Sequence, residues 1–338
     1  MNMKILVVGG AGYIGSHMVK HLVLAGHEVV VLDDLSTGLA SQVKWGRLVV
    51  GSTADAELLA SLFKEHRFDG VMHFAGSSLV GESVAEPARY YRNNVANTLN
   101  LLDVMTVHGV RHFVFSSTAA VYGEPVTTPI GETHPCAPIN PYGASKWMVE
   151  RMLQDHAAAY GLNSVSLRYF NASGADPEGE LGECHDPETH LIPLILRSAS
   201  SRSGPVTVFG RDYPTSDGTC IRDYVHVTDL CEAHALALEA MFAGRLEGAT
   251  AFNLGSEQGA SVNAVIEVAQ ALVREDGYEV AVLEGTRRRG DPAVLVADSS
   301  LARQTLGWKP RFGQLREIIA HAWQWEKRLA GLGKNNRK

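Results

Sequence analysis

A tyrosine and a lysine stand four positions apart in the segment 140–146, at Tyr142 and Lys146. The segment opens with Asn140 and Pro141, residue types that favour the first positions of a helix. Residues four apart share one face of a helix, so the phenol and the ammonium are expected to lie close together. An ammonium favours a nearby phenolate, so we expect Lys146 to lower the pKa of Tyr142 from about 10 toward neutrality. Such a phenol can take a proton from an alcohol and return it.

A third polar side chain, Thr118, ends a strand-like run at residues 115–118. Ligands of open α/β sheets bind at the carboxyl ends of the strands, which places this hydroxyl beside a crevice. We expect Thr118 to hydrogen-bond the substrate oxygen that Tyr142 deprotonates, while a redox cofactor takes the hydride. In most proteins a tyrosine and a lysine four residues apart are only a packed ring and a solvated charge. The position of Thr118 at the end of a strand is what favours a catalytic role for Tyr142 and Lys146.

A glycine-rich turn follows the first apolar run, with glycines at Gly9, Gly12 and Gly15. Residues without a Cβ let the backbone approach a pyrophosphate, whose charge rests on the first amides of the helix expected over residues 13–24. Asp33 ends the second apolar run, where dinucleotide folds place the carboxylate that binds the ribose hydroxyls. A carboxylate repels a 2′-phosphate, so the pattern predicts a site for NAD rather than NADP.

Apolar runs rich in Val, Ile and Leu alternate with amphipathic segments over the first half of the chain. Runs that are apolar on both faces are typical of a parallel sheet covered by helices on both sides. The expected strands cover residues 4–8, 28–32, 48–50, 70–74, 111–115 and 164–167. The sequence therefore predicts an α/β fold with a Rossmann-type doubly wound parallel sheet.

The alternation ends after residue 171, where a stretch rich in Gly, Pro, Asp and Glu begins. We expect residues 1–171 to form the dinucleotide-binding Rossmann domain, with segments near 219–255 returning to it. The strand-like runs that could rejoin the main sheet are residues 225–227 and 251–254. The parts expected to form a smaller α/β substrate domain are residues 172–218 and 256–338.

Composition and charge limit the class of partner. The chain has 338 residues, 45% of them hydrophobic, as expected of a folded globular protein. Its 30 Lys and Arg against 37 Asp and Glu give a net charge of −7, which disfavours a nucleic-acid partner bound through its phosphates. No run reaches the roughly 18 apolar residues of a membrane span, and the four cysteines form no Cys-x-x-Cys pair. We therefore expect a cytoplasmic protein with no nucleic-acid or membrane partner.

Six sequence blocks carry a more specific resemblance. They are GGAGYIGSH at 9–17, HFAG at 73–76, VGES at 80–83, YYRNNV at 90–95, LRYFN at 167–171 and DGTCIRDYVHV at 217–227. With them the chain resembles the extended short-chain dehydrogenase/reductase superfamily and, within it, the UDP-glucose 4-epimerase (UDP-galactose 4-epimerase) family. The resemblance implies that bound NAD takes hydride from C4 of UDP-glucose or UDP-galactose and returns it to the opposite face of a 4-keto intermediate. It also implies a homodimer.

By this resemblance Tyr142 is the acid and base, Lys146 tunes it and holds the nicotinamide ribose, and Thr118 assists. The positions that match cofactor contacts are Gly9, Gly12, Tyr13, Ile14, Gly15, Asp33, Asp34, Phe74, Ala75, Gly76, Asn93, Tyr142, Lys146 and Tyr169. The positions that match substrate contacts are Thr118, Tyr142, Asn171, His190, Arg222, Arg288 and Asp291. Arginine forks suit a diphosphate better than lysine does, so the smaller domain is expected to bind the nucleotide sugar.

Alternatives remain both for the sugar that the protein accepts and for whether it catalyses a reaction at all. Leu295 matches a position beside the sugar that ranges in relatives from tyrosine to small residues. The alternative substrates are therefore UDP-N-acetylhexosamine, UDP-xylose, UDP-arabinose and UDP-glucuronate. A dinucleotide-sensing regulator without turnover is disfavoured, because it gains nothing from a tuned phenol. Dehydration is disfavoured because Ala119 and Ala120, which follow Thr118, have no proton to offer.

The stretch 183–190 combines Glu, Cys, His and Asp side chains that could ligate a metal ion. Its spacing matches none of the usual zinc patterns. We therefore expect no metal site, and His190 is interpreted as a substrate contact.

Overall fold

The structure is a computed structural model that describes residues 2–288 and 291–335. A parallel sheet of seven strands forms its larger part, in the order β10-β6-β5-β4-β1-β2-β3. The strands are β1 (Lys4–Val8), β2 (Glu28–Asp33), β3 (Arg47–Val50), β4 (Gly70–His73), β5 (His112–Thr118), β6 (Asn163–Tyr169) and β10 (Ala249–Leu254). The strand order reverses between β1 and β4, which is the switch point of a doubly wound sheet.

Both faces of this sheet are buried. On β1, Ile5 and Val7 enter one core while Leu6 and Val8 enter the other, and none of the four is more than 2% exposed. The first core is covered by α1 (Tyr13–Leu24), α8 (Val227–Phe242) and α10 (Ser300–Leu306). The second is covered by α2 (Ala56–His66), α5 (Asn97–Val107) and α6 (Pro141–Tyr160). This two-sided burial explains why the strands are continuous apolar runs.

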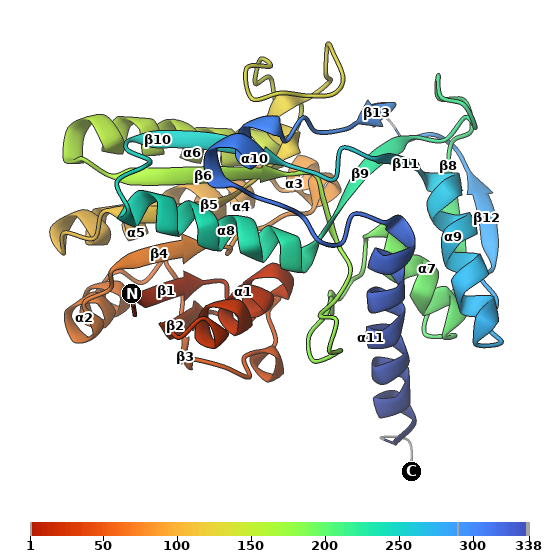
Figure 1. Ribbon diagram of the computed structural model, residues 1–338, viewed down its shortest axis with the longest axis horizontal. Helices are drawn as coiled ribbons and strands as arrows, with labels where there is room; N and C mark the ends of the chain where they lie inside the picture. Colours follow the sequence, from red (N-terminus) through yellow and green to blue (C-terminus); the bar gives the residue numbers. More distant parts are fainter. Residues whose placement is uncertain (1, 289–290, 336–338) are drawn as a thin grey trace.

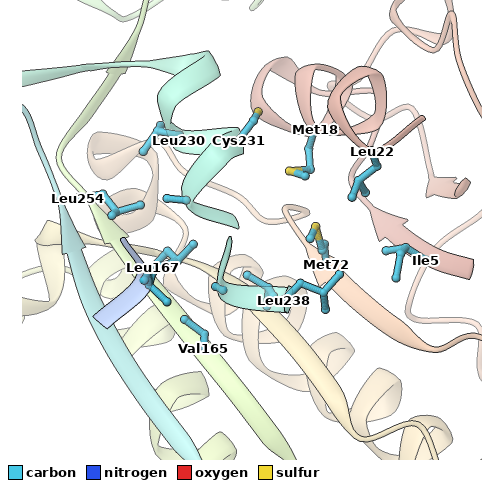
Figure 2. Packing of buried hydrophobic residues seen from close by; sticks show 14 of the residues in the cluster. Ile5, Met18, Leu22, Met72, Val165, Leu167, Leu230, Cys231, Leu238 and Leu254 are labelled. Atoms are coloured by element: carbon cyan, nitrogen blue, oxygen red, sulfur yellow. The ribbon is translucent and has the colours of Figure 1, made fainter. Parts of the chain in front are cut away.

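The first core shows how the helices are held on the sheet. Figure 2 shows Met18 and Leu22 of α1 and Leu230 and Leu238 of α8 pointing toward the strands, with Met72 of β4 among them. All five side chains are at most 1% exposed. Packing at this density fixes α1, and with it the turn that leads into the helix.

The remaining strands form two small sheets beside the main one. The first contains β7 (Asn171–Ser173), β9 (Ile221–His226), β11 (Gly259–Ser261) and β13 (Val294–Leu295). The second contains β8 (Val206–Phe209) and β12 (Val282–Gly285). A third core joins α7 (Leu191–Ala199), α9 (Val262–Glu275) and α11 (Leu315–Asn335), which gather at one end of the molecule in Figure 1. Shorter helical segments are η1 (Ala40–Gln42), α3 (Val80–Ala85), α4 (Pro87–Tyr90), the π-helix η2 (Tyr91–Ala96) and η3 (Ala119–Tyr122).

The predicted α/β fold with a doubly wound parallel sheet is confirmed, but one strand lies elsewhere than expected. The run at 251–254 does return to the main sheet, as β10. The run at 225–227 does not, because β9 pairs with β7 on the short segment that follows β6. A short apolar run fits either sheet, so only the tertiary pairing decides. The boundaries of the two domains stay a prediction.

Within the described part of the chain, no helix combines the length and the apolar character required to cross a lipid bilayer.

Candidate active site

Tyr142 lies in the first turn of α6, and the start of this helix is fixed by a cap and a close contact. Asn140 Oδ1 accepts the backbone N–H of Gly143 at 2.8 Å. A Cβ on Gly143 would lie 2.4 Å from the carbonyl oxygen of Ala120, so the helix end packs directly on the turn after β5. Thr118 is the last residue of β5, and it lies close enough to the Tyr142 phenol for its hydroxyl to lower the pKa of that group. The structure therefore brings together the two groups that the sequence pairs for proton transfer.

Lys146 lies one turn further along α6 and is only 4% exposed. Its Nζ donates to the carbonyl oxygen of Ser116 at 2.9 Å and lies 4.8 Å from the centre of the Phe115 ring. Burial lowers the pKa of Lys146 to about 8, because the charged form loses its hydration. A Cβ on Gly76 would lie 3.2 Å from Nζ, so the ammonium borders the loop after β4.

The pKa of Tyr142 moves in the direction opposite to the expected one. Burial raises it above its ordinary value, and the contact with Thr118 offsets only part of that rise. Lys146 directs its ammonium to the Ser116 carbonyl. The prediction that Lys146 lowers the pKa of Tyr142 is therefore wrong for the protein on its own. Residue spacing fixes which side chains share a face, whereas desolvation depends on everything packed around them.

The glycine turn after β1 is packed so tightly on neighbouring backbone that Gly9 and Gly15 have no room for a side chain. Gly9 has a φ of +81°, and a Cβ there would lie 2.4 Å from the backbone nitrogen of Ala75. A Cβ on Gly15 would lie 2.1 Å from the carbonyl oxygen of Gly9. Helix α1 begins after Gly12 with no side-chain cap, so its first amides can bind an anion. These residues fit the pyrophosphate of NAD.

The carboxylate of Asp33 is held beside this turn. Its two oxygens accept the backbone N–H groups of Ala11 at 2.8 Å and Leu35 at 2.9 Å. Burial raises the pKa of Asp33, and the two hydrogen bonds offset only part of that rise. Each oxygen keeps a lone pair that can accept a ribose hydroxyl. The neighbouring Asp34 turns away, accepting the backbone N–H of Ser36 at 2.9 Å.

The side chain of Tyr13 is engaged elsewhere. Its hydroxyl donates to the carbonyl oxygen of Gly174 at 2.7 Å, and its ring meets His17 edge-on. Ile14 packs against the first core of the main sheet. Both residues therefore offer a cofactor their backbone amides rather than their side chains.

The loop after β4 connects the glycine turn with Lys146. Ala75 contacts the position of the missing Cβ of Gly9, and Gly76 contacts Lys146 Nζ in the same way. Phe74, which precedes them, packs against the core under α8. Ala75 and Gly76 thus connect the glycine turn with Lys146, while the side chain of Phe74 is directed to the core.

Two asparagines on the π-helix η2 fix this loop. Asn93 Nδ2 donates to the hydroxyl oxygen of Ser77 at 3.1 Å, as suits its expected place near the cofactor. Asn94 accepts the N–H of Ser77 at 2.8 Å, and its Nδ2 donates to the Ser77 carbonyl at 2.9 Å and to Ser145 Oγ at 3.0 Å. Asn94 was not expected, because a π-helix has no sequence signature; such segments are frequent at functional sites.

Tyr169 is the last residue of β6 and lies beside the end of β5. It lies opposite Thr118 in the strand register, and its hydroxyl hydrogen-bonds Ser116 Oγ. Burial raises the pKa of Tyr169, so its phenol stays neutral. The residue is thus placed at the strand ends where the sequence expects a cofactor contact.

A buried ion pair between Arg168 and Glu150 joins the elements that carry the site. Arg168 Nε donates to both oxygens of Glu150 at 3.0 and 3.1 Å, and the two side chains are 6% and 3% exposed. Ser117 Oγ donates to Glu150, while Arg168 Nη1 donates to Tyr122 Oη at 2.9 Å. The pair ties α6 to β5 and β6. Sequence reasoning missed it, although Glu150 follows Tyr142 by eight residues and so shares its helix face.

The substrate positions on the smaller sheet also meet. Arg222 Nη2 lies 3.2 Å from Asp291 Oδ1, and Nη1 donates to the carbonyl oxygen of Pro292 at 2.9 Å. Leu295 pairs with Arg222 in the register of β13 and β9. It also packs against the hydrophobic cluster formed by Ala119, Val121, Tyr122 and Ile130. The strand pairing thus places the expected diphosphate residue beside the expected sugar-flanking residue.

Two of the three remaining substrate positions, Asn171 and Arg288, lie on separate segments. Asn171 opens β7 and pairs with Tyr224 of β9. Arg288 stacks its guanidinium on the Phe209 ring, with 3.9 Å between Cζ and the ring centre. No described contact joins Arg288 to Arg222.

His190 belongs to a charged cluster. Its Nδ1 hydrogen-bonds Glu183 Oε1, and His185 Nδ1 lies 2.8 Å from the same oxygen. Burial alone would raise the pKa of Glu183, but the two histidines lower it to about 2. Burial alone would lower the pKa of His185, but Glu183 and Glu188 raise it to about 10. Burial alone would lower the pKa of His190, but the same carboxylates raise it above its ordinary value.

Comparison with known proteins agrees with this geometry. The model of the NAD dependent epimerase/dehydratase family matches residues 5–255. The UDP-glucose 4-epimerase of Halalkalibacterium halodurans is 49% identical over 326 residues, which is 96% of this chain and 96% of that protein. The crystal structure of UDP-glucose 4-epimerase from Brucella ovis in complex with NAD superposes with a TM-score of 0.91 at 48% identity, covering 96% of this chain and 98% of that one.

A further solved structure carries both kinds of ligand. UDP-glucose 4-epimerase from Bifidobacterium longum, in complex with NAD+ and UDP, has a TM-score of 0.89 at 37% identity, covering 96% of this chain and 98% of that one. The predicted resemblance, fold class and NAD dependence are thereby confirmed. The chain belongs to the NAD dependent epimerase/dehydratase family.

Proposed function

We propose that the chain interconverts UDP-glucose and UDP-galactose by inverting C4 with a bound NAD that is regenerated in each turnover. The single observation that carries this is the path from the glycine turn to Lys146. Gly9 abuts Ala75, and Gly76 abuts Lys146 Nζ, so a dinucleotide bound along this path ends beside Lys146, one helical turn from Tyr142 on α6. The relatives that match the chain over 96% of its length are named UDP-glucose 4-epimerases, which supports the same substrate.

The residues divide the chemistry between them. Bound NAD would supply a hydride acceptor and a positive charge in the crevice. Tyr142 takes the proton of the sugar O4 hydroxyl, and Thr118 orients the same oxygen. Because burial raises the pKa of Tyr142, the phenolate is favoured only once positive charge enters the crevice. Lys146, fixed on the Ser116 carbonyl, is then placed to hold the nicotinamide ribose.

Net inversion requires that the ketone present both faces to the same cofactor. A diphosphate held firmly while the sugar is held loosely would allow this. Arg222 can anchor the diphosphate because its guanidinium is already oriented by Asp291. The related UDP-sugars remain alternative substrates. A homodimer and a cytoplasmic location stay predictions from the sequence.

A coupled assay tests the proposal. The purified chain, given UDP-galactose and no added NAD, is expected to form UDP-glucose. Tyr142→Phe should lower kcat by about 10²- to 10⁴-fold, the usual contribution of a positioned acid and base, while UDP affinity is kept. Tyr160→Phe, on the exposed end of the same helix, is the matched control and should retain parental activity.

Three results would contradict the proposal. Near-parental turnover by Tyr142→Phe would remove the phenol from the reaction. Absence of conversion of UDP-galactose together with conversion of a pentose or glucuronate nucleotide would move the chain to another substrate. A chain that binds NAD but converts none of these sugars would be a dinucleotide sensor.

A further inference from the structure

The segment that joins β7 to α7 gathers four side chains around one point. Glu183, His185, Glu188 and His190 each offer one ligand atom, and these atoms all lie within 4.8 Å of one another. Both histidines turn Nδ1 to the same Glu183 oxygen. Their Nδ1 atoms lie 3.8 and 4.0 Å from Glu188 Oε1. Sequence spacing gave no sign of this convergence, because the segment has no regular secondary structure.

We propose that these four side chains form a binding site for a divalent transition-metal ion of the zinc class. Imidazole nitrogen with carboxylate oxygen is a donor set that zinc accepts, whereas calcium and magnesium prefer oxygen alone. Four protein ligands complete the tetrahedral shell of a structural site. The inference reverses the expectation that the stretch 183–190 binds no metal.

The surrounding structure holds the ligands in place. The side chains of Glu183 and Glu188 are 5% and 2% exposed. Glu188 Oε1 accepts the backbone N–H groups of Thr189 at 2.9 Å and His190 at 3.0 Å. Arg197 donates to the carbonyl oxygen of His185 at 2.9 Å. Contacts of this kind orient metal ligands in known sites and raise their affinity.

The charge of the cluster suits a divalent ion. Glu183 and Glu188 bring two negative charges into a buried position, which must be balanced. One divalent ion between these carboxylates balances both charges. Arg197, 3.1 Å from Glu188 Oε2, contributes one further positive charge.

A second acidic group in the chain provides a contrast. Asp176, Glu178 and Glu180 also converge, but Lys20 Nζ already lies 2.7 to 2.9 Å from all three. An ammonium at the centre leaves no place for a metal cation. This group therefore serves as the control cluster.

Metal binding to the purified full-length chain tests the proposal. After dialysis against a chelator, zinc is titrated by calorimetry and bound zinc is counted by mass spectrometry. We expect one zinc per chain. His185→Gln should weaken zinc binding by at least about tenfold, and Glu178→Gln should bind as the parent does. Circular dichroism of each variant without metal shows that it is folded.

Cobalt provides a second readout that does not depend on any variant. Cobalt(II) in this site should show the intense visible bands of four-coordinate geometry without a thiolate charge-transfer band. A thiolate band would place the ion on Cys184 instead and would overturn the proposal. It would also be overturned if the parent binds no zinc, if His185→Gln binds as tightly as the parent, or if Glu178→Gln loses the ion. The cluster would then be a protonated ion-pair network alone.

Discussion

Removing one partner of the buried pair Glu150 and Arg168 is expected to destabilise the protein strongly. Arg168→Met leaves the Glu150 carboxylate 3% exposed, with the hydroxyl of Ser117 as its remaining described donor. Breaking a buried pair in this way costs about 3–5 kcal/mol, because an uncompensated charge stays inside the protein. Replacing both side chains by methionine removes both charges, so the double variant should be no less stable than either single one.

Equilibrium unfolding in urea measures the effect, followed by tryptophan fluorescence and by circular dichroism so that coincident transitions can be checked. The matched control is Arg316→Met, which breaks the pair of Arg316 with Glu275, whose side chains are 53% and 62% exposed. This control should change the unfolding free energy by less than about 1 kcal/mol. The reasoning is refuted if Arg168→Met unfolds within 1 kcal/mol of the parent. It is also refuted if the costs of the two single variants simply add in the double variant.

Three further predictions concern the cofactor turn, acid stability and sugar scope. Gly9→Ala places a Cβ 2.4 Å from the nitrogen of Ala75, so the amount of NAD released on denaturation should fall at least about tenfold. The control Gly204→Ala, which places a Cβ in open space, should release as much NAD as the parent. Burial lowers the pKa of His226 to about 3, below its unfolded value of about 6.5. Its contribution to stability is therefore present above pH about 6.5 and is lost as the pH falls, so between pH about 7.5 and 5.5 the parent should lose about 1.4 kcal/mol more unfolding free energy than His226→Asn. Leu295→Ala should raise the rate with UDP-N-acetylglucosamine relative to UDP-glucose about tenfold or more, and an unchanged ratio of kcat/KM would exclude this residue from sugar selection.

Features encoded within one short stretch of the chain could be predicted from the sequence. The glycine turn with Asp33 is such a case, because a strand, a tight turn and a helix follow one another within a single βαβ unit. The pair Tyr142 and Lys146 is another, because helical periodicity alone puts both on one face. In each case the local backbone fixes the relation between the residues, whatever packs against them later.

Features set by packing could not be predicted. The pKa of Tyr142 is raised by burial among the residues packed around it, so the direction of the shift cannot be read from the spacing of Tyr142 and Lys146. Arg168 lies 18 residues from Glu150, and no period links a strand residue to a helix residue at that distance. The ligand cluster around Glu183 shows the same limit, since its residue types were visible while their convergence was not.

Helix α1 links the two sides of the site. Its first turn faces the glycine turn, while the Tyr13 hydroxyl binds the carbonyl oxygen of Gly174. Later in the same helix, the side chain of Lys20 is 9% exposed. It binds three carboxylates of the segment that follows Gly174, among them Asp176 at 2.9 Å. The segment that carries His190 is thus anchored on the cofactor helix as well as on α7. Hydride transfer requires the sugar carbon and the nicotinamide to meet at contact distance, with little tolerance for displacement. If His190 contacts the nucleotide sugar as the sequence predicts, α1 anchors both binding surfaces, and any shift of this helix moves them together.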